Sequence, residues 1–537
     1  MSKTESGKPP ADRVSKIMTA EEAISLIPNG ATVTASGFCG SCFAEDIAVH
    51  LRDIYLQTGK PNNLTMVYGA GIGDFNTRGL GVLGVEGLIG KIVASHFGAS
   101  PNLTRFVNEK KIPAYSLPQG VMSHLFRDIA ANKPRTITKV GLHTFVDPRL
   151  EGGKVNHLCD ESLVEVIRFD DEEYLAYKTF PIDIAILRGT TADEDGNISM
   201  EREALTLDTQ AQAMAAKNSG GLVIVQVERI VQRGSLNPKN VKIPGVMVDA
   251  VVVAKDMSNH LQTYDQGYNP SFSGEARIPM ALVPRLKMSA RKIVARRAAF
   301  ELTPGDFINL GIGVPEGIAN IANEEGILEE LTLTAEPGII GGMPASGLSF
   351  GASYNPQAII DQPPQFDFYQ GGGLDATFLG LAQADKHGNL NVSKFGPKLV
   401  GPGGFIDISQ NTQKVVFAGT FTAGGLKVEV EDGKISIVQE GKVQKFVDQV
   451  EQVTFSGRYA IENNQQVLFI TERCVFRLAK EGLVLTEIAP GVDLQRDIID
   501  QMEFKPIVDE QLRLMDSRIF QSPPMGLKQD TTEETDQ

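Results

Sequence analysis

The sequence predicts an α/β protein of two related open domains, each with a largely parallel sheet covered by helices. Three observations support this prediction. The chain has 537 residues, more than one hydrophobic core usually serves. Segments of the first half recur in the second half. Short apolar runs such as Gly221–Val227 and Val415–Gly419 alternate with helical patterns, which is typical of strands buried on both faces of a sheet.

The first unit opens with a helix, a turn and a strand. Thr19 and Glu22 have the spacing of a capping box, which predicts that a short helix begins there. Pro28–Gly30 predicts a turn, and the apolar run Ala31–Ala35 predicts a strand. A loop, Ser36–Gly40, follows that strand.

The second unit repeats this order. A helical pattern over Ser289–Leu302 stops at Pro304 and Gly305, and Gly305 stands 275 positions after Gly30. A strand-like run, Asp306–Gly313, and a second helical pattern, Val314–Ala319, follow. The two openings therefore correspond to each other.

A second repeat shows that the duplication is unequal. The pattern Ala-Asp-x-x-Gly-Asn occurs at 192–197 and again at 384–389, an offset of only 192 positions. The first unit must therefore carry extra residues between its strand and this motif. We predict domains at 16–285 and 286–525, the first like an alpha subunit and the second like a beta subunit, with the boundary near Pro279 and Pro284.

The two termini lack the features of folded structure. Residues 1–15 and the acidic tail 526–537 are predicted to be disordered, since Lys528–Gln537 contains no apolar residue. The first residues also lack the apolar core of a signal peptide, and no apolar stretch reaches the ~18 residues of a membrane span. We therefore expect a cytoplasmic protein that does not bind membranes.

Composition argues against several classes of partner and site. The chain has 51 basic and 66 acidic residues, a net charge of −15, which disfavours nucleic acid and anionic membranes. Its four cysteines cannot form a disulfide framework. Cys39 and Cys42 have the spacing of half a metal or redox site, but no second pair accompanies them. The seven histidines lack metal-ligand spacing, so we expect no metal site.

Common catalytic motifs are missing from the sequence. Gly69–Gly73 resembles a dinucleotide loop, but its glycine spacing does not fit G-x-G-x-x-G. No Walker loop or H-E-x-x-H is present. Phosphoryl transfer and zinc proteolysis therefore lack their usual groups, and attention turns to carboxylates.

One glutamate stands where an open α/β sheet usually binds its ligand. Glu336 ends the strand-like run Leu331–Ala335 and precedes the glycine turn Pro337–Gly342. The alternation of the strand turns Glu336 away from the apolar face, so we expect it to face the surface. Ligands of such sheets bind at the carboxyl ends of strands. An ordinary surface glutamate before a turn is the alternative interpretation.

Several long motifs resemble the family I coenzyme A transferases. These are Glu336–Gly342, Phe366–Asp375 and Gly401–Asp407, together with three further runs. The chain is most similar to the fused-subunit branch, which contains short-chain acyl-CoA:acetate (3-oxoacid) CoA-transferase and propionate CoA-transferase. The resemblance covers about residues 15–525. The three further runs are Tyr115–Val121, Ile470–Arg473 and Glu487–Val492.

The resemblance implies a role for four residues. Glu336 matches the family's nucleophile, and Gln119 matches an amide that assists at the thioester. Gly403 and Gly404 belong to a loop whose backbone N–H groups face the reacting carbonyl. The loop after the first strand departs from the family pattern, so no binding role is carried over to Gly37–Gly40. The departures are Ser36, Ser41 and Phe43, where Gly, Gly and Pro are usual.

The resemblance also implies an activity and a mechanism. Glu336 would attack an acyl-CoA thioester to form an anhydride, and CoA thiolate would then give a glutamyl-CoA thioester. Such ping-pong transfer to acetate, propionate, butyrate or acetoacetate uses CoA as a substrate and needs no metal or other cofactor. Donors that stabilise the oxyanion and a cleft that excludes water would assist. A homo-oligomer, dimer or tetramer, is implied as well.

Two alternative functions remain open. An acyl-CoA hydrolase on the same scaffold would need no acceptor carboxylate. A sensor without catalytic activity would bind acyl-CoA even after loss of Glu336. The length of the acyl chain is not fixed by the sequence, because one methylene changes discrimination by only ~1–3 kcal/mol.

Overall fold

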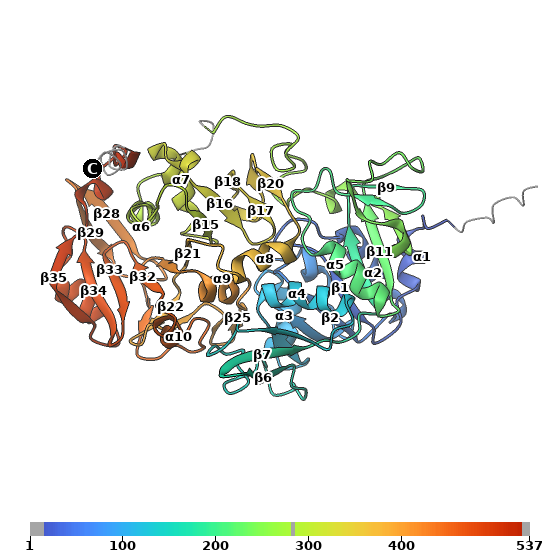
Figure 1. Ribbon diagram of the computed structural model, residues 1–537, viewed down its shortest axis with the longest axis horizontal. Coiled ribbons are helices and arrows are strands. Elements are labelled where there is room, and N and C mark those ends of the chain that lie inside the picture. Colours follow the sequence, from blue (N-terminus) through green and yellow to red (C-terminus); the bar gives the residue numbers. More distant parts are fainter. Residues whose placement is uncertain (1–14, 281–284, 529–537) are drawn as a thin grey trace, which may run out of the picture.

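The computed structural model describes residues 15–280 and 285–528. The two halves of the chain lie side by side, the first blue to green and the second yellow to red (Figure 1). Pro284 of the predicted boundary, the tail from 529 and residues 1–14 lie outside the described residues. No helix in the described ranges is long and apolar enough to cross a membrane.

The start of the predicted disordered tail is attached to the second half. The backbone N–H groups of Gly526 and Leu527 donate to the carboxylate of Glu325, at 2.8 and 3.3 Å. Leu527 is also buried. The prediction of disorder is therefore wrong for these residues, because a buried carboxylate on the neighbouring helix accepts their hydrogen bonds.

The first half is built on one seven-stranded sheet. Every neighbouring pair in it is parallel, and the order is β14-β11-β8-β1-β2-β3-β4. The strands are β1 (Thr32–Ala35), β2 (Leu64–Tyr68), β3 (Ile89–Ala94), β4 (Ala114–Ser116), β8 (Ile184–Arg188), β11 (Leu222–Val227) and β14 (Ala250–Val253).

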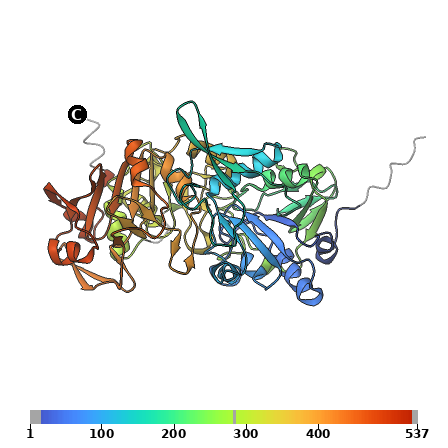
Figure 2. The same cartoon turned by 90° about the horizontal axis from the view of Figure 1, so that it is seen from below.

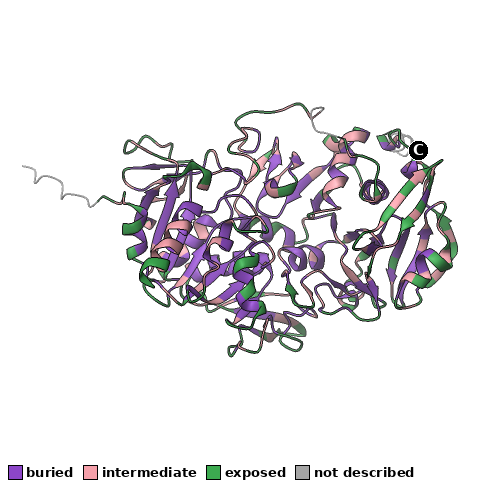
Figure 3. Ribbon diagram, turned by 180° about the vertical axis from the view of Figure 1, so that it is seen from behind, coloured by how far each residue is buried: buried purple, intermediate pink, exposed green. Residues whose placement is uncertain are grey.

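Helices cover both faces of this sheet. One core contains residues of α1 (Ala20–Ser25), α2 (Glu45–Thr58) and α3 (Pro101–Asn108). The other contains residues of α4 (Gln119–Ala130) and α5 (Thr209–Asn218). The first four residues of β8 belong to the two cores in turn and are buried, which explains why this part of the strand is apolar without alternation. Figure 3 shows the buried strands of both halves.

The second half contains a ten-stranded sheet with a parallel centre. Its order is β20-β17-β16-β15-β21-β26-β32-β33-β34-β35. The five central strands, from β16 to β32, are parallel, whereas β17 and β33 pair antiparallel at the two flanks. The strands are β15 (Phe307–Leu310), β16 (Thr332–Ala335), β17 (Ile339–Ile340), β20 (Ala358–Ile359), β21 (Ala376–Gly380), β26 (Lys414–Ala418), β32 (Gln466–Ile470), β33 (Cys474–Ala479), β34 (Gly482–Ile488) and β35 (Ile507–Leu514).

Helices cover the second sheet on both faces as well. Residues of α6 (Ala290–Ala299) and α7 (Glu316–Glu325) belong to one core. The other core takes in residues of α8 (Gln362–Gln370), α9 (Phe405–Asn411) and α10 (Gly457–Glu462). The prediction of two α/β units with covered, largely parallel sheets is therefore confirmed.

The duplication is visible in the strand order and in hydrogen bonds. The order β11-β8-β1-β2 recurs as β26-β21-β15-β16. In the repeated Ala-Asp-x-x-Gly-Asn turn, Asn197 Nδ2 donates to Asp193 and Asn389 Nδ2 donates to Asp385, both at 3.0 Å. The unequal offset arises because the first half carries additional elements between β2 and β8. They include β3, β4 and an antiparallel sheet of β5 (Arg135–Thr138), β6 (Val164–Phe169) and β7 (Glu172–Lys178), whose β6–β7 hairpin protrudes (Figures 1 and 2).

A buried carboxyl lies where the two halves meet. Asp208, just before α5, has its pKa raised to about 7, chiefly by burial. A Cβ built on Gly69 would lie 3.2 Å from Asp208 Oδ2 and 3.6 Å from Gln362 Nε2 of the second half. Within the described ranges Asp208 Oδ2 has no hydrogen-bond partner. The carboxyl is therefore poorly suited to hold a charge.

Replacing Asp208 with asparagine should stabilise the protein at pH 8 but not at pH 4. A carboxyl with a raised folded pKa favours the folded state below its unfolded pKa, and this stability is lost as pH rises towards 7. The gain at pH 8 should reach about 1 to 4 kcal/mol in urea unfolding. Asp171→Asn, on an exposed turn, is the control. An equal gain at both pH values would contradict a neutral Asp208.

Candidate active site

A cavity of about 270 Å³ lies between the two halves, and Glu336 lines it. Both halves contribute walls. The first half supplies Phe38, Cys39, Gly71, Phe75, His96 and Gln119. The second half supplies Asn309, Gly311, Ile312, Glu336, Phe350, Leu379, Gly380, Leu381, Ala382, Val392, Val400, Gly401, Pro402, Gly403, Gly404, Phe405 and Ile408.

Glu336 follows β16 directly, as the sequence predicts, but it does not face the surface. Its exposed fraction is 9%. The glycine loop at 401–404 and the first half cover this strand end, so the expectation of a surface-facing side chain is wrong. Burial raises the pKa of Glu336, and the hydrogen bond from Asn309 opposes that rise. A carboxylate here is less solvated than in water, which makes it more nucleophilic.

Asn309 holds the carboxylate from the adjacent strand. Its Nδ2 lies 3.5 Å from Glu336 Oε2 and 3.4 Å from the hydroxyl of Tyr369. The Tyr369 hydroxyl in turn donates to Thr334 on β16, at 2.7 Å. Sequence reasoning missed Asn309. The sequence feature that could have revealed Asn309 is that it is the single amide in the otherwise apolar strand Phe307–Leu310, where it is fully buried.

Gln119 reaches the same cavity from the first half. It is the first residue of α4, and its backbone N–H donates to the carbonyl of Gly403 at 3.0 Å. Its side chain is buried, and among the described residues its Nε2 has no hydrogen-bond partner. A buried N–H donor without an acceptor is costly unless a ligand or water satisfies it. The structure therefore brings Gln119 and Glu336 to one site.

The glycine loop at 401–404 belongs to the second half, contacts the first half and lies against Glu336. Gly404 lies against Glu336, since a Cβ added to it would be 3.4 Å from Glu336 Cγ. A Cβ on Gly401 would lie 2.4 Å from the carbonyl oxygen of Ser95, so only glycine fits there. The N–H of Gly403 donates to that same Ser95 carbonyl at 3.1 Å.

The hydrogen bond from Gly403 to Ser95 contradicts the expectation that the Gly403 N–H faces the reacting carbonyl. Gly403 cannot offer its N–H to a reacting carbonyl while Ser95 accepts it, because one N–H makes one good hydrogen bond. Gly404 is the better placed of the two glycines. The sequence could not reveal this difference, since the acceptor belongs to the other half of the chain.

His96 is a further lining residue that sequence reasoning missed. Burial lowers its pKa to about 4, so the ring is neutral at neutral pH. A Cβ on Gly403 would lie 4.0 Å from its Cδ2. Its sequence neighbourhood carries no motif that distinguishes it from the other histidines. The described lining residues therefore present no positive charge to Glu336.

The loop after β1 also contributes to the cavity, although the resemblance assigned it no binding role. Phe38 and Cys39 line the wall, and the ring of Phe38 lies 5.9 Å from that of Phe350 between centroids. Burial and the charges of Glu336 and Glu316 raise the pKa of the Cys39 thiol to about 12. Cys39 and Cys42 are both free. Over the described residues, no cluster of three or more His, Cys, Asp or Glu could hold a metal.

Two half-exposed apolar residues mark the outer part of the cavity. Phe75 of the first half is 47% exposed, and Ile312 of the second half is 49% exposed. The deeper residues, such as Phe350 and Ile408, are buried. The cavity therefore runs from an apolar mouth to the carboxylate inside.

Comparison with known proteins agrees with this geometry. The profile of the family "Coenzyme A transferase" matches residues 17–254. The caffeate CoA-transferase of Acetobacterium woodii is 51% identical over 96% of this chain and 99% of its own. The acetate CoA-transferase YdiF of Escherichia coli K12 is 44% identical over 95% of this chain and 96% of its own.

A solved structure has the same fold over nearly the whole chain. The acyl-CoA transferase YdiF of E. coli O157:H7, in a thioester complex with CoA, superposes with a TM-score of 0.90 at 43% identity. The match covers 95% of this chain and 97% of that one. Sequence identity of this extent, together with the shared fold, shows that the chain belongs to the coenzyme A transferase family of enzymes.

Proposed function

We propose that this enzyme moves CoA between a short-chain acyl-CoA and a free carboxylate through a thioester on Glu336. One observation carries the proposal. A buried glutamate with a raised pKa and a buried amide donor without a partner meet in a cavity that both halves enclose. Neither feature stabilises the fold, since each is a buried polar group with incomplete hydrogen bonding.

The chemistry needs only a carboxylate and a thiolate. Glu336 attacks the thioester carbonyl, the C–S bond breaks, and CoA leaves as the thiolate with its electron pair. The thiolate then attacks the glutamyl carbonyl of the anhydride and expels the first acid as its carboxylate. In the second half-reaction, the acceptor carboxylate attacks the glutamyl-CoA thioester, which forms a new anhydride and releases the CoA thiolate. The thiolate then attacks the acceptor's carbonyl in that anhydride, which forms the new acyl-CoA and frees the carboxylate of Glu336. No proton is gained or lost over the cycle.

Uncharged hydrogen-bond donors suit a reaction in which each step forms a negatively charged oxyanion. Each attack creates an oxyanion, which the Nε2 of Gln119 and the N–H of Gly404 would stabilise. Neither donor carries a charge that would hold Glu336 in an ion pair. Neutral His96, whose pKa burial lowers to about 4, would not protonate the departing thiolate readily. Enclosure between the halves would slow hydrolysis of both intermediates.

Removing the Asn309 donor should move the acid limb of the kcat/KM profile to higher pH. Asn309 stabilises the charged form of Glu336, so Asn309→Leu should raise the pKa of the Glu336 carboxyl further. Thr377→Val is the control, because Thr377 bonds Asn309 without contacting Glu336. An acid limb that does not move would contradict the role of Asn309.

The acceptor is proposed to be acetate, propionate, butyrate or acetoacetate. The relatives named for acetate support this class. A second candidate is an aromatic acid, because Phe38, Phe350 and Phe405 line the cavity and a 51% identical relative is named for caffeate. A screen of acetyl-CoA against the four short acids and a phenylpropenoate separates the classes by kcat/KM.

The proposal also covers the compartment, the cofactor requirement and the assembly of the enzyme. We propose that it works in the cytoplasm without a metal or other cofactor, and that it is a homodimer or homotetramer. Light scattering of the purified chain measures the assembly. Activity after dialysis against a chelator tests the independence from metal.

Acyl-CoA without an acceptor should convert the enzyme to a CoA adduct. The first half-reaction can finish alone, so mass spectrometry should find CoA on the peptide that contains Glu336. Borohydride should reduce the thioester to an alcohol, and initial-rate plots against the two substrates should be parallel. Steady release of free acid without an acceptor would indicate a hydrolase instead. Acyl-CoA binding without an adduct or exchange would indicate a sensor.

A further inference from the structure

Two cysteines hold unusual backbone conformations in the loop that reaches the cavity. Cys39 has φ +48° and Cys42 has φ +59°, in the left-handed region that non-glycine residues rarely adopt. Such a conformation is strained and persists only where the surrounding structure holds it. The loop Gly37–Phe43 must therefore be held by its contacts.

One end of this loop is held inside the cavity. The N–H of Cys39 donates to Gly71 at 2.6 Å, and the carbonyl of Cys39 accepts from Gly73 at 2.9 Å. Phe38 packs against Phe350 of the second half. A Cβ on Gly40 would lie 2.5 Å from the Leu348 carbonyl oxygen, so the loop is fitted closely between the halves.

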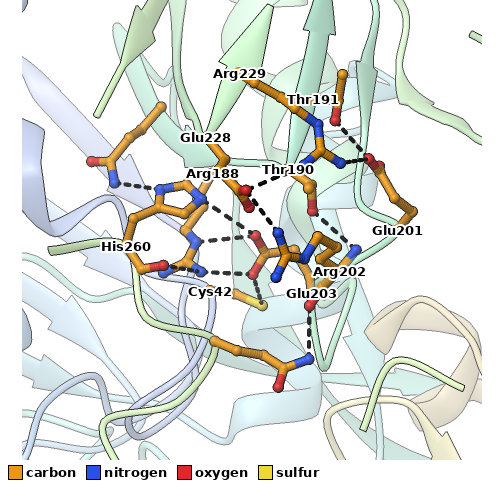
Figure 4. Close-up of polar contacts among 12 residues, drawn as sticks. Cys42, Arg188, Thr190, Thr191, Glu201, Arg202, Glu203, Glu228, Arg229 and His260 are labelled. Carbon is orange, nitrogen blue, oxygen red and sulfur yellow. Dashed lines mark hydrogen bonds and ion pairs between the residues drawn. The ribbon is translucent and has the colours of Figure 1, made fainter. Parts of the chain in front are cut away.

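The other end joins a buried charged cluster (Figure 4). Arg188, the last residue of β8, makes two contacts of 3.1 Å with the carboxylate of Glu203. The thiol of Cys42 donates to the Leu205 carbonyl at 3.2 Å and lies 3.5 Å from Glu203 Oε2. Arg188 also lies 3.5 Å from the carbonyl of Phe43. Arg188 and Glu203 thus both contact the loop.

Neighbouring groups fix the orientation of this ion pair. Gln226 Nε2 donates to His260 Nδ1 at 2.9 Å, so the His260 proton lies on Nε2, 3.8 Å from Glu203. Burial and the two nearby arginines, Arg188 and Arg202, lower the pKa of His260 to about 2 and keep it neutral. Among the described residues, the charged partner of Glu203 is therefore Arg188, whose guanidinium is almost fully buried.

The place of the cluster in the fold explains its effect. Arg188 ends β8, which lies beside β1 at the point where the strand order of the first sheet reverses. In the second sheet the corresponding position, between β15 and β21, opens into the cavity through Gly311 and Gly380. In the first half the charged cluster and the loop occupy this place instead.

We propose that the Arg188–Glu203 ion pair is a positioning element that holds the loop Gly37–Phe43, and with it the Phe38 and Cys39 wall of the active site. Neither residue lines the cavity, so the pair acts through the loop. The kinetic part of the test rests on the proposed transferase function. The chemical part does not, because alkylation of Cys39 needs no turnover.

Glu203→Gln keeps the shape of the side chain and removes its charge. Arg188 would lose its partner, and the loop should relax away from Glu336. Iodoacetamide should then alkylate Cys39 at least about 10-fold faster at pH 8, because the thiol would lose the burial, and with it the nearby Glu336 and Glu316 charges, that raise its pKa. The pH of half-maximal labelling should fall from about 12 towards about 8.5.

The same variant should raise KM for the acceptor carboxylate at least about fivefold and change kcat less, because the wall binds substrate and transition state alike. Glu324→Gln is the matched control, since Glu324 forms an equally buried ion pair with Lys292 away from the loop. It should leave the labelling profile and KM unchanged. Peptide mass spectrometry assigns the label to Cys39, the one partly exposed cysteine of the four.

Cys42→Ala gives a second test, because it cuts the contact through which the loop touches Glu203 of the pair. If the pair holds the loop, this variant should also speed Cys39 labelling, and it remains available if Glu203→Gln does not fold. Wild-type labelling profiles in both variants, or an equal change in Glu324→Gln, would overturn the proposal. Absence of a CoA adduct on Glu336 would overturn the proposed function and leave the labelling result standing.

Discussion

Glu336→Gln should lower CoA transfer by at least about 10³-fold, because an amide cannot form the anhydride. The fold should survive and become more stable at pH 8. Burial raises the folded pKa of Glu336, so ionisation costs stability as pH rises above the unfolded value. The gain in melting temperature should therefore be present at pH 8 and absent at pH 4.

Asp306→Asn is the control for this experiment. The pKa of Asp306 is also raised, by burial and by Asp375, but Asp306 does not line the cavity. Its replacement should affect stability in the same direction and leave transfer intact. Retention of more than a few per cent of activity in Glu336→Gln would reject Glu336 as the nucleophile.

Gln119→Ala should lower kcat by about 10-fold to 10³-fold with a smaller change in KM. The Nε2 of Gln119 is a buried donor without a partner among the described residues, which suits a group that acts when the oxyanion forms. The substitution keeps the backbone N–H that bonds the Gly403 carbonyl. The loop should therefore stay in place.

Ser123→Ala is the matched control for Gln119. Ser123 lies one turn further along α4, is equally buried, and also has an unpartnered side-chain oxygen within the described chain. Its loss should change kcat less than about twofold, since it does not line the cavity. If Gln119→Ala changes KM alone, Gln119 binds substrate without assisting the chemistry.

Local patterns predicted much of the fold because they reflect local physics. The capping box at Thr19 is formed by two reciprocal hydrogen bonds, and α1 begins directly after it. The helical pattern that begins at Ser289 corresponds to α6, which Ser289 caps by accepting the backbone N–H of Lys292. The repeated Asp and Asn turns fold alike in both halves, since their bonds lie within six residues. The antiparallel strands that flank the second sheet were not foreseen, because pairing direction depends on the path of the chain.

The sequence by itself determined the family, the duplicated α/β architecture and the position of Glu336 at a strand end, because motifs, apolar periodicity and turns are local properties of the chain. Only the tertiary structure decided that Glu336 is buried and that Ser95 occupies the Gly403 N–H. It also placed Asn309, His96 and Cys39 around the cavity. These features arise where the halves meet, and residues hundreds of positions apart determine burial, hydrogen-bond partners and charge there.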